Sequence, residues 1–544
     1  MKLVTAAQMR ELEQKAVEGG TPLDALMESA GLAVAQEAWL SLGVVVGRRI
    51  LVLAGPGNNG GDGLVAARHL ADWEGDVVVY LLAARPEDDA NLAKARALGV
   101  PVIAASGDAG FESLQQALDG AELVIDALLG TGRSRPIDGA LAEVLRRLQD
   151  AAGRAHPPKV IAVDLPTGVD ADSGRADAVA VHADMTVTFG LAKVGLYTLP
   201  GSEHAGRVQV VDIGIPRNAE QAVPLDLLAT GWVRDRLPKR PKSANKGTFG
   251  RALIVAGSSS YVGAARLAAE ACYRAGAGLV TVACTREVQH MIAASIPEAT
   301  WLPLDDAGGA IAALAADAVR EQLASYDVLL IGPGMSQADG VRAFVERVLG
   351  GVPDNVRGCV VDADALNALA QQPGWRIEAP CVLTPHPGEM ARLLGTTVDA
   401  VQDDRLNVAV AAAARWGQVV VLKGAHTVIA APDGRAAISP YADPLLASAG
   451  TGDVLAGAIA GLLAQGLAPF EAAACGVYLH GLAAAELGED LGDRGLLASD
   501  LLPALPRAIR IVLHGRPARP LPQLGDLAGL GALDTIFGTL PDPS

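Results

Sequence analysis

The sequence predicts two successive α/β units built on parallel sheets, followed by a tail. Short aliphatic strands alternate with helical patterns in two separate series, which is typical of doubly wound α/β folds. The chain has 544 residues, of which 50% are hydrophobic and only 3% aromatic. Because a chain of this length exceeds a single hydrophobic core, we expect two domains rich in small aliphatic residues.

The first series of strands runs from Arg48 to about Ile215. Its predicted strands lie in RRILVLAG, DVVVYLLA, AELVIDALLG, KVIAVDLPTG, DMTVTFG and RVQVVDIG. A polar, basic stretch follows, and a second series continues through RALIVAG, YDVLLIGPG, GCVVDAD, PCVLTPHPGE and VVVLKGAHTVIA. We therefore place the joint near residues 216–245 and divide the chain into domains at 1–220 and 221–515 and a Pro/Gly/Leu-rich tail at 516–544. The basic run at 239–246 is interpreted as a solvated linker, with a phosphate site as the alternative.

Charge and cysteine content restrict the classes of partner. The formal net charge of −17 argues against nucleic acid and against an anionic membrane surface. The five cysteines have no CxxC spacing, and their mostly apolar surroundings favour buried thiols in the cytoplasm. No apolar run is long enough to span a bilayer, and the first residues carry no apolar targeting segment. We expect neither a nucleic-acid nor a membrane partner.

The loop GPGNNGGDG, residues 55–63, joins a predicted strand to a predicted helix. It matches the dinucleotide fingerprint GxGxxG, but the next strand ends in LAA at 82–84 instead of the acid that binds ribose. Two further strand ends carry polar oxygens, namely Asp126 in VIDALLGTG and Asp164 with Thr167 in VDLPTG. Carboxyl ends of parallel strands share one edge, so these loops should converge on a site for an anion and a hard cation. Helix caps and turns are the alternative for each loop.

A second glycine-rich loop, SAGTGDVLAGAIAG at 448–461, also runs into a predicted helix. Its amides face the positive helix end, and Asp453 lies where a base could take a proton from a hydroxyl. KGAHT at 423–427 offers amides, an ammonium and a hydroxyl to a nucleotide, and His386 in TPHPGE is either a contact residue or a turn residue. Lys193, after another strand, either reaches an anionic ligand or extends to solvent. The second loop predicts phosphoryl transfer, because a helix cap would explain Asp453 but not the glycines.

These motifs carry a family resemblance. GPGNNGGDG, VIDALLGTG and VDLPTGVD, with DALMESAG in the leading helix, resemble the epimerase domain of the bifunctional NAD(P)H-hydrate repair enzymes over residues 1–215. KGTFG, YVGAA, IGPGM, TPHPGE, KGAHT and AGTGDVLAG resemble the ribokinase-like dehydratase domain of the same enzymes from Ala244 to Val512. The resemblance implies a Rossmann-like domain that interconverts the R and S epimers of hydrated NADH or NADPH. It also implies a ribokinase-like domain that dehydrates the S epimer back to NADH or NADPH.

The resemblance also implies site residues. In the first domain the hydrate would contact Asn58, Asn59, Gly60, Gly61, Asp62, Gly130, Thr131, Gly132, Arg133, Ser134, Arg135, Pro136 and Asp164. Potassium would be held by Asn59, Asp126 and Thr167, and Asp164 is the candidate acid or base. In the second domain the hydrate would contact Ala264, Gly334, His386 and Asp453. The adenine nucleotide would contact Lys423, Gly424, Ala425, His426, Thr427 and Gly452, and Asp453 is the candidate base.

The implied reaction explains why a kinase-like site could catalyse a dehydration. Phosphorylation of the hydrate hydroxyl by ADP or ATP, with Mg²⁺, would create a good leaving group. Similarity to bacterial forms favours ADP, and Leu445 and Leu446 depart from the small residues usual before the loop. The expected partners are NADHX, NADPHX, the nucleotide and a second copy of the chain in a homo-oligomer. The alternative is a small-molecule kinase with a non-catalytic nucleotide-binding first domain.

Overall fold

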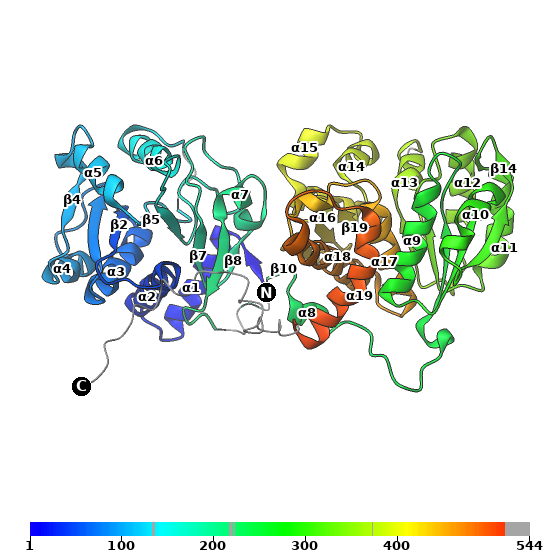
Figure 1. Ribbon diagram of the computed structural model, residues 1–544, viewed down its shortest axis with the longest axis horizontal. Helices are drawn as coiled ribbons and strands as arrows, with labels where there is room; N and C mark the ends of the chain where they lie inside the picture. Colours follow the sequence, from blue (N-terminus) through cyan, green and yellow to red (C-terminus); the bar gives the residue numbers. More distant parts are fainter. Residues whose placement is uncertain (133–135, 217–219, 221–222, 373, 517–544) are drawn as a thin grey trace, which may run out of the picture.

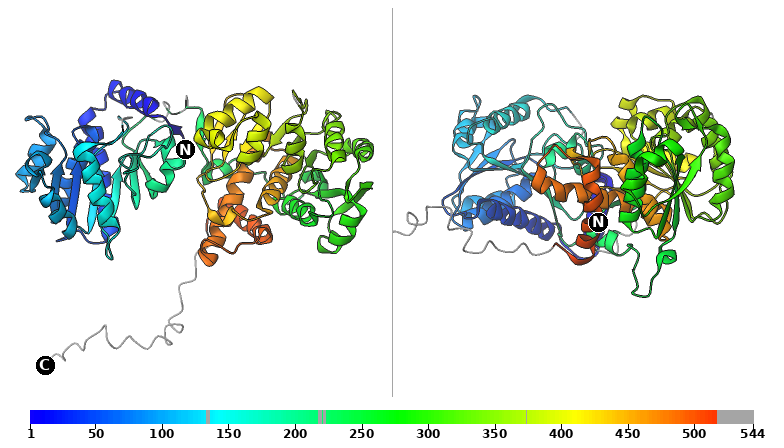
Figure 2. Two further views of the ribbon diagram at one scale, coloured as in Figure 1. Left: turned by 90° about the horizontal axis from the view of Figure 1, so that it is seen from above. Right: turned by 45° about the vertical axis from the view of Figure 1, so that its right-hand side comes forward.

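The computed structural model describes residues 1–132, 136–216, 220, 223–372 and 374–516. Two large sheets lie in two lobes side by side along the longest axis (Figure 1). The further views in Figure 2 show the same two lobes in contact near the labelled N-terminus. Nearly all of the predicted tail, residues 517–544, lies outside the described residues.

The first unit contains a seven-stranded parallel sheet in the order β4-β3-β2-β5-β6-β7-β9. Its strands are β2 (Arg49–Ala54), β3 (Asp76–Leu81), β4 (Val102–Ala104), β5 (Leu123–Ala127), β6 (Lys159–Val163), β7 (Met185–Phe189) and β9 (Arg207–Val211). Six of these strands were predicted, whereas the three-residue β4 was missed. The chain fills one side of β2 with β3 and β4 before it returns to place β5 on the other side. The crevice between the ends of β2 and β5 is therefore the position where such sheets bind ligands.

Helices cover both faces of this first sheet. The helices are α1 (Ala6–Glu18), α2 (Leu23–Leu42), α3 (Asn58–Asp72), α4 (Ala90–Ala97), α5 (Glu112–Gly120), α6 (Gly139–Ala152) and α7 (Gly201–Ala205). Apolar residues of α1 to α4 pack with one face of the sheet, and those of α5 and α6 pack with the other. The predicted doubly wound arrangement is confirmed.

The second unit contains a ten-stranded sheet in the order β10-β21-β20-β19-β18-β17-β16-β11-β12-β13. Its strands are β10 (Leu225–Leu227), β11 (Arg251–Val255), β12 (Leu279–Thr285), β13 (Thr300–Leu304), β16 (Val328–Ile331), β17 (Gly358–Val361), β18 (Cys381–Leu383), β19 (Val419–Leu422), β20 (Val428–Ala430) and β21 (Ala436–Ile438). Neighbours are parallel except β19 with β20 and β20 with β21. The sequence analysis missed β10, β12, β13 and β21. β13 contains Pro303 and is an edge strand, where proline is tolerated.

Two groups of helices enclose the second sheet. One face packs with α9 (Val262–Ala275), α17 (Thr451–Ala464), α18 (Pro469–Leu491) and α19 (Ala498–His514). The other packs with α11 (Ala316–Leu323), α12 (Asp339–Leu349) and α13 (Ala363–Ala370). The remaining helices are α8 (Thr230–Arg234), α10 (Arg286–Ile292), α14 (Pro387–Leu394), α15 (Val398–Asp403) and α16 (Arg405–Trp416). No helix within the described ranges has the length and hydrophobicity that a membrane crossing needs.

The two units share one apolar cluster. The short strand β1 (Leu3–Val4) pairs in parallel with β8 (Ala192–Lys193) of the first unit. Lys2 forms a bridge with Asp226 of β10, and its Nζ lies 3.0 Å from Asp226 Oδ1. Around this contact lies a buried group that we call the joint cluster: Leu3, Ala192, Val194, Leu225, Leu227, Val428 and Ile438. The contact between the units is therefore packed with buried apolar side chains.

Candidate active sites

Four of the five glycines in the loop at 55–63, all except Gly57, are required by packing. A Cβ on Gly55 would lie 1.9 Å from the Leu128 carbonyl oxygen, and one on Gly60 would lie 2.0 Å from the Gly55 carbonyl oxygen. A Cβ on Gly61 would lie 2.8 Å from Met27 Sδ. The first turn of α3 thus packs directly against the ends of β2 and β5, which fixes the position of the neighbouring Asn59.

The predicted convergence of three loops occurs at this sheet edge. The Thr167 amide donates to Asp126 Oδ2 over 2.8 Å, and the Thr167 hydroxyl donates to Asp126 Oδ1 over 2.7 Å. Asn59 Nδ2 donates to the Leu129 carbonyl over 3.0 Å, and the Leu129 amide donates to Thr167 Oγ1 over 3.0 Å. The structure therefore brings Asn59, Asp126 and Thr167, which come from three different loops, into one hydrogen-bonded group.

Asp126 is a buried carboxyl with an altered affinity for protons. Its side chain is fully buried, and burial raises its pKa to about 6 although hydrogen bonds from Thr167 and Leu128 oppose the shift. Within the described ranges, no basic side chain contributes to this pKa. A carboxylate, an amide and a hydroxyl are the oxygen donors that a hard monovalent cation takes. These residues therefore fit a potassium ion.

Asp164 stands in a separate polar cluster at the ends of β6 and β7. Its φ of 64° is in the left-handed region, which is strained for a residue with a side chain and is often found at functional sites. Asp164 Oδ1 accepts from Lys193 Nζ and, over 3.0 Å, from Thr188 Oγ1. Lys193 is 1% exposed and also donates to the Phe189 carbonyl over 3.2 Å. Lys193 thus pairs with Asp164 and does not extend to solvent.

Two more carboxyls belong to this cluster. Burial, together with the negative charges of Asp164 and Glu13, holds the pKa of Asp62 well above its usual value. Burial also raises the pKa of Glu13 in α1. The sequence analysis missed Glu13, since a lone glutamate on an amphipathic helix is normally a solvated residue. Asp62, Asp164 and Lys193 could hold and move a proton at this site.

A cavity of about 460 Å³ lies beside the loop at 130–136. Gly130 and Pro136 line it, together with Pro166 and Asp170. A Cβ on Gly130 would lie 3.2 Å from Asn59 Oδ1, so the loop adjoins the predicted potassium group. Thr131 and Gly132 continue the loop, whereas the predicted contacts Arg133, Ser134 and Arg135 lie outside the described residues.

The second site is built at the amino end of α17. Gly450 begins the helix with a φ of 90°, and Asp453 lies in its first turn. Lys423 Nζ lies 2.7 Å from Asp362 Oδ1, and a Cβ on Gly452 would lie 3.5 Å from the same nitrogen. Burial and the carboxylate of Asp362 raise the pKa of Asp453 to about 7, while the Lys423 charge lowers it. Asp453 is thus a carboxyl able to accept a proton near neutral pH.

Asp362 is a functional candidate that the sequence analysis missed. It is 1% exposed, and besides Lys423 it accepts a hydrogen bond from Thr384 Oγ1 over 2.7 Å. It follows β17 directly, so the strand-end rule that selected Asp126 would also have selected it. Its carboxylate positions Lys423 and, through its charge, helps to keep Asp453 able to hold a proton.

Besides Asp453, the predicted hydrate contacts of the second unit are Ala264 in the first turn of α9, Gly334 in the loop after β16 and His386 at the start of α14. A Cβ on Gly334, whose φ is 61°, would lie 2.7 Å from the Cβ of Ala264, so these two residues are neighbours. His386 caps α14, and its Nδ1 accepts from the Gly388 amide over 3.0 Å. Burial and the nearby Lys423 charge lower the pKa of His386. The turn role is therefore observed for His386, and its half-exposed side chain can also meet a ligand.

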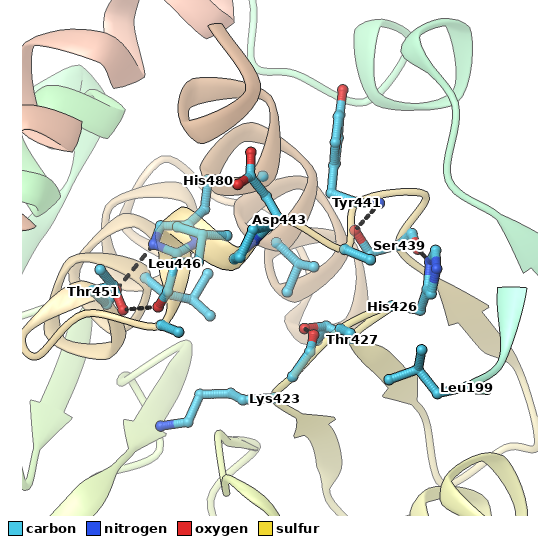
Figure 3. Close-up of a pocket in the computed structure, with 18 of the residues that line it drawn as sticks. Leu199, Lys423, His426, Thr427, Ser439, Tyr441, Asp443, Leu446, Thr451 and His480 are labelled. Atoms are coloured by element: carbon cyan, nitrogen blue, oxygen red, sulfur yellow. Dashed lines mark hydrogen bonds between the residues drawn. The ribbon is translucent and has the colours of Figure 1, made fainter. Parts of the chain in front are cut away.

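A cavity of about 640 Å³ is lined by every predicted nucleotide contact, as Figure 3 shows in part. These are Lys423, Gly424, Ala425, His426, Thr427 and Gly452. Leu446 also lines the cavity, whereas Leu445 is buried in the core, so only the second of the two unusual leucines shapes the cavity wall. A volume of this size is typical of small-molecule sites.

Hydrogen bonds fix the cavity wall. His426, at a φ of 50°, donates through Nδ1 to the Ser439 carbonyl over 3.0 Å. The Thr427 hydroxyl donates to the Gly424 carbonyl over 2.8 Å. Buried His480 donates through Nε2 to the Thr451 carbonyl over 3.0 Å, and burial lowers its pKa to about 4. The neutral imidazole of His480 therefore orders the start of α17.

A buried arginine stabilises the start of the KGAHT loop, residues 423–427, through hydrogen bonds to backbone carbonyls. Arg405 Nη2 donates to the Leu422 carbonyl over 3.0 Å and to the Lys423 carbonyl over 3.2 Å. A Cβ on Gly424, at a φ of 137°, would lie 3.1 Å from the guanidinium. Sequence reasoning missed both Arg405 and His480, because each comes from a helix whose pattern is apolar.

The chain is similar to known proteins over both units. The family described as YjeF-related protein N-terminus matches residues 23–195, and the family described as NAD(P)H-hydrate dehydratase matches residues 252–507. The chain is 46% identical to the bifunctional NAD(P)H-hydrate repair enzyme Nnr of Moorella thermoacetica, over 94% of this chain and 97% of that protein. It is 38% identical to the enzyme of the same name from Thermofilum pendens, over 94% and 96%.

A solved structure resembles the second unit. It is the ADP/ATP-dependent NAD(P)H-hydrate dehydratase from Bacillus subtilis, co-crystallised with ATP and Mg²⁺, at 35% identity and a TM-score of 0.46. The match covers 54% of the present chain and 100% of the chain in the Bacillus subtilis structure. Because the same relatives match both units over nearly their whole length, the comparisons favour the repair enzyme over the alternative of a small-molecule kinase with a non-catalytic first domain. The chain belongs to the family of bifunctional NAD(P)H-hydrate repair enzymes.

Proposed function

We propose that the second unit dehydrates the S epimer of NADHX or NADPHX with ADP or ATP as phosphoryl donor. The observation that carries this proposal is Asp453, with a pKa raised to about 7, beside Lys423 at the amino end of α17. Family membership supplies the class of reaction, and the geometry of the described residues supports the proposed residue roles. ADP is the preferred donor in this proposal.

Asp453 takes the proton of the hydrate hydroxyl as that hydroxyl oxygen bonds to the terminal phosphorus of the nucleotide. The bond from this phosphorus to the bridging oxygen breaks, and AMP leaves when ADP is the donor or ADP leaves when ATP is the donor. The amides at Gly450 to Gly452 and the Lys423 ammonium stabilise the charge that develops on the phosphoryl oxygens. The ring nitrogen lone pair then breaks the bond from carbon to the phosphate oxygen. Loss of a proton from the adjacent ring carbon restores the reduced nicotinamide. His386, Ala264 and Gly334 position the hydrate.

Magnesium fits this site together with the nucleotide. The described residues hold no group of three or more His, Cys, Asp or Glu side chains suited to a metal ion. Mg²⁺ would be bound mainly by the nucleotide phosphates and water, and it would offset the charge of the transferring group. The protein's own part is to hold the nucleotide through Lys423 to Thr427 and Gly452.

We propose that the first unit interconverts the R and S hydrates. Asp164 is the acid or base that transfers a proton in this reaction. Lys193 keeps the Asp164 carboxylate oriented by donating a hydrogen bond to it. Asn58 to Asp62 and the loop from Gly130 to Pro136 bind the hydrate. Potassium, held by Asn59, Asp126 and Thr167, would supply a fixed positive charge beside the substrate.

Further proposals concern setting and assembly. We propose domains at residues 1–220 and 221–515, a cytoplasmic location, and a homo-oligomer that acts on free NADHX and NADPHX. The five cysteines are all buried and free, which supports a reducing compartment.

Asp453→Asn tests the dehydratase proposal. With both hydrate epimers and ADP, recovery of the reduced nicotinamide should slow by about 10²- to 10⁴-fold, the usual effect of losing a general base. Nucleotide affinity should persist, because the helix amides do not depend on this charge. Epimer exchange should be unchanged, since the residue lies in the other unit.

The matched control is Asp500→Asn, in the first turn of α19, where its carboxylate accepts from the Leu497 amide; this variant should leave the dehydration rate unchanged. Near-normal dehydration by Asp453→Asn would refute the assigned base. Accumulation of a stable phosphorylated product by the wild-type protein would instead indicate an ordinary kinase.

A further inference from the structure

The nucleotide cavity of the second unit has one wall that comes from the first unit. Leu199, Ser202 and Glu203 line it together with Lys423 to Thr427. Leu199 precedes α7, and Ser202 and Glu203 lie within that helix. In Figure 1, α7 lies on the side of the first lobe that faces the second lobe. The cavity is therefore formed between the two units.

The two ends of this cavity differ in charge. Lys423 and the amino end of α17 supply positive charge at one end, which suits phosphates. Figure 3 shows Leu199 beside His426, on the side of the cavity away from Lys423 and Thr451. Glu203 adds a carboxylate to the wall that Leu199 belongs to, and it would repel a phosphate there. A nucleotide bound with its phosphates at Lys423 therefore directs its adenosine end toward the first unit.

The segment that carries Leu199, Ser202 and Glu203 is held in place by contacts with both units. The Tyr197 ring meets the His426 ring edge-on, with centroids 5.7 Å apart and planes at 88°. The Thr198 hydroxyl donates to the carbonyl of Val194, which belongs to the joint cluster, over 3.0 Å. At the start of α7, the Gly201 amide donates to the Gly174 carbonyl over 2.7 Å. Leu199 is thus held beside the KGAHT loop before any ligand binds.

We propose that Leu199, Ser202 and Glu203 of the first unit bind the adenosine end of the nucleotide used by the second unit. Half-buried Leu199 offers an apolar surface to the base. The Ser202 hydroxyl and the exposed Glu203 carboxylate offer hydrogen-bond acceptors to the amine of the base or to the ribose hydroxyls. This inference rests on the proposed nucleotide site, and it makes one unit a part of the recognition surface of the other.

The test uses the full-length protein and the nucleotides AMP, ADP and ATP without hydrate. Dissociation constants are measured by calorimetry for the wild type, Leu199→Ala and Glu203→Ala. Each variant should raise the dissociation constant about three- to tenfold, the effect of losing part of one leucine contact or one hydrogen bond. The factor should be the same for all three nucleotides, because the altered side chains face the part that they share.

Glu112→Ala, an exposed glutamate that begins α5 in the same unit, is the matched control and should leave all three constants unchanged. Epimer exchange and the thermal midpoint without nucleotide should be unaffected by Glu203→Ala. If Leu199→Ala lowers the thermal midpoint, the dissociation constants of Glu203→Ala alone test the inference, because the Glu203 side chain is exposed.

Two results would overturn the inference while leaving the proposed function intact. One is an unchanged dissociation constant in Glu203→Ala with normal binding by the wild type. The other is a loss of affinity that grows with the number of phosphates, which would place the wall at the phosphate end. Absence of nucleotide binding by the wild-type protein would instead overturn the proposed function itself, and the inference with it.

Discussion

The raised pKa of Asp453 leads us to expect that the rate of dehydration depends on pH. Burial and the Asp362 carboxylate raise its pKa to about 7, and a general base must be ionised to act. The value of kcat/KM for the hydrate should therefore fall about tenfold per pH unit below pH 7 and level off above it. Asp362→Asn removes a like charge and should move this limb to lower pH, whereas a limb that stays in place would show that another group titrates.

Because the Asp126 carboxyl is buried, we expect potassium to stabilise the protein more at pH 8 than at pH 5. Its folded pKa, about 6, lies above the usual aspartate pKa of 3.8, so ionisation destabilises the fold as pH rises from 4 to 6. Above pH 6 the cost is about 3 kcal/mol unless a cation offsets it. Replacing sodium by potassium at equal ionic strength should raise the thermal midpoint at pH 8 by several degrees more than at pH 5. Asp126→Asn should abolish this difference, and equal effects at both pH values would contradict the assigned cation site.

The first turn of α3 should tolerate no side chain at Gly60. Gly60→Ala places a methyl group 2.0 Å from the Gly55 carbonyl oxygen, and such overpacking costs about 1–3 kcal/mol or more. Gly57→Ala is the matched control in the same loop. It meets nothing within 4 Å and should cost no more than about 1 kcal/mol as a changed helix cap. Denaturant unfolding of both variants measures the difference, and equal losses would contradict the packing role.

The sequence predicted those elements whose signal is local. Asp126 at a strand end and Asp453 at a helix start were found because a glycine-rich loop beside a strand or a helix is visible in one short window. Arg405 and His480 were missed because their partners, the carbonyls of Leu422 and Thr451, lie 17 and 29 residues away along the chain. Only the folded chain reveals such contacts. The wall at Leu199 was unpredictable for the same reason, since it depends on how the units pack.

Leu3 should stabilise the contact between the two units. Leu3 is fully buried in the joint cluster, and Leu→Ala at such a site costs about 2–5 kcal/mol. Leu3→Ala should speed hydrogen exchange in β8 and β10, which belong to different units. Leu12→Ala, buried within the first unit alone, is the matched control and should leave β10 protected. Unchanged exchange in β10 of Leu3→Ala would show that the cluster does not join the units.

The placement of β1 also determines when it can fold during synthesis. β1 is made among the first residues, yet its partner strand lies at Ala192–Lys193 and its bridge to β10 needs Asp226. At about 5–20 residues per second, these partners leave the ribosome tens of seconds after Leu3 does. The two-residue strand must stay unpaired during that interval. Completion of the contact between the units is thus timed by the emergence of the second unit.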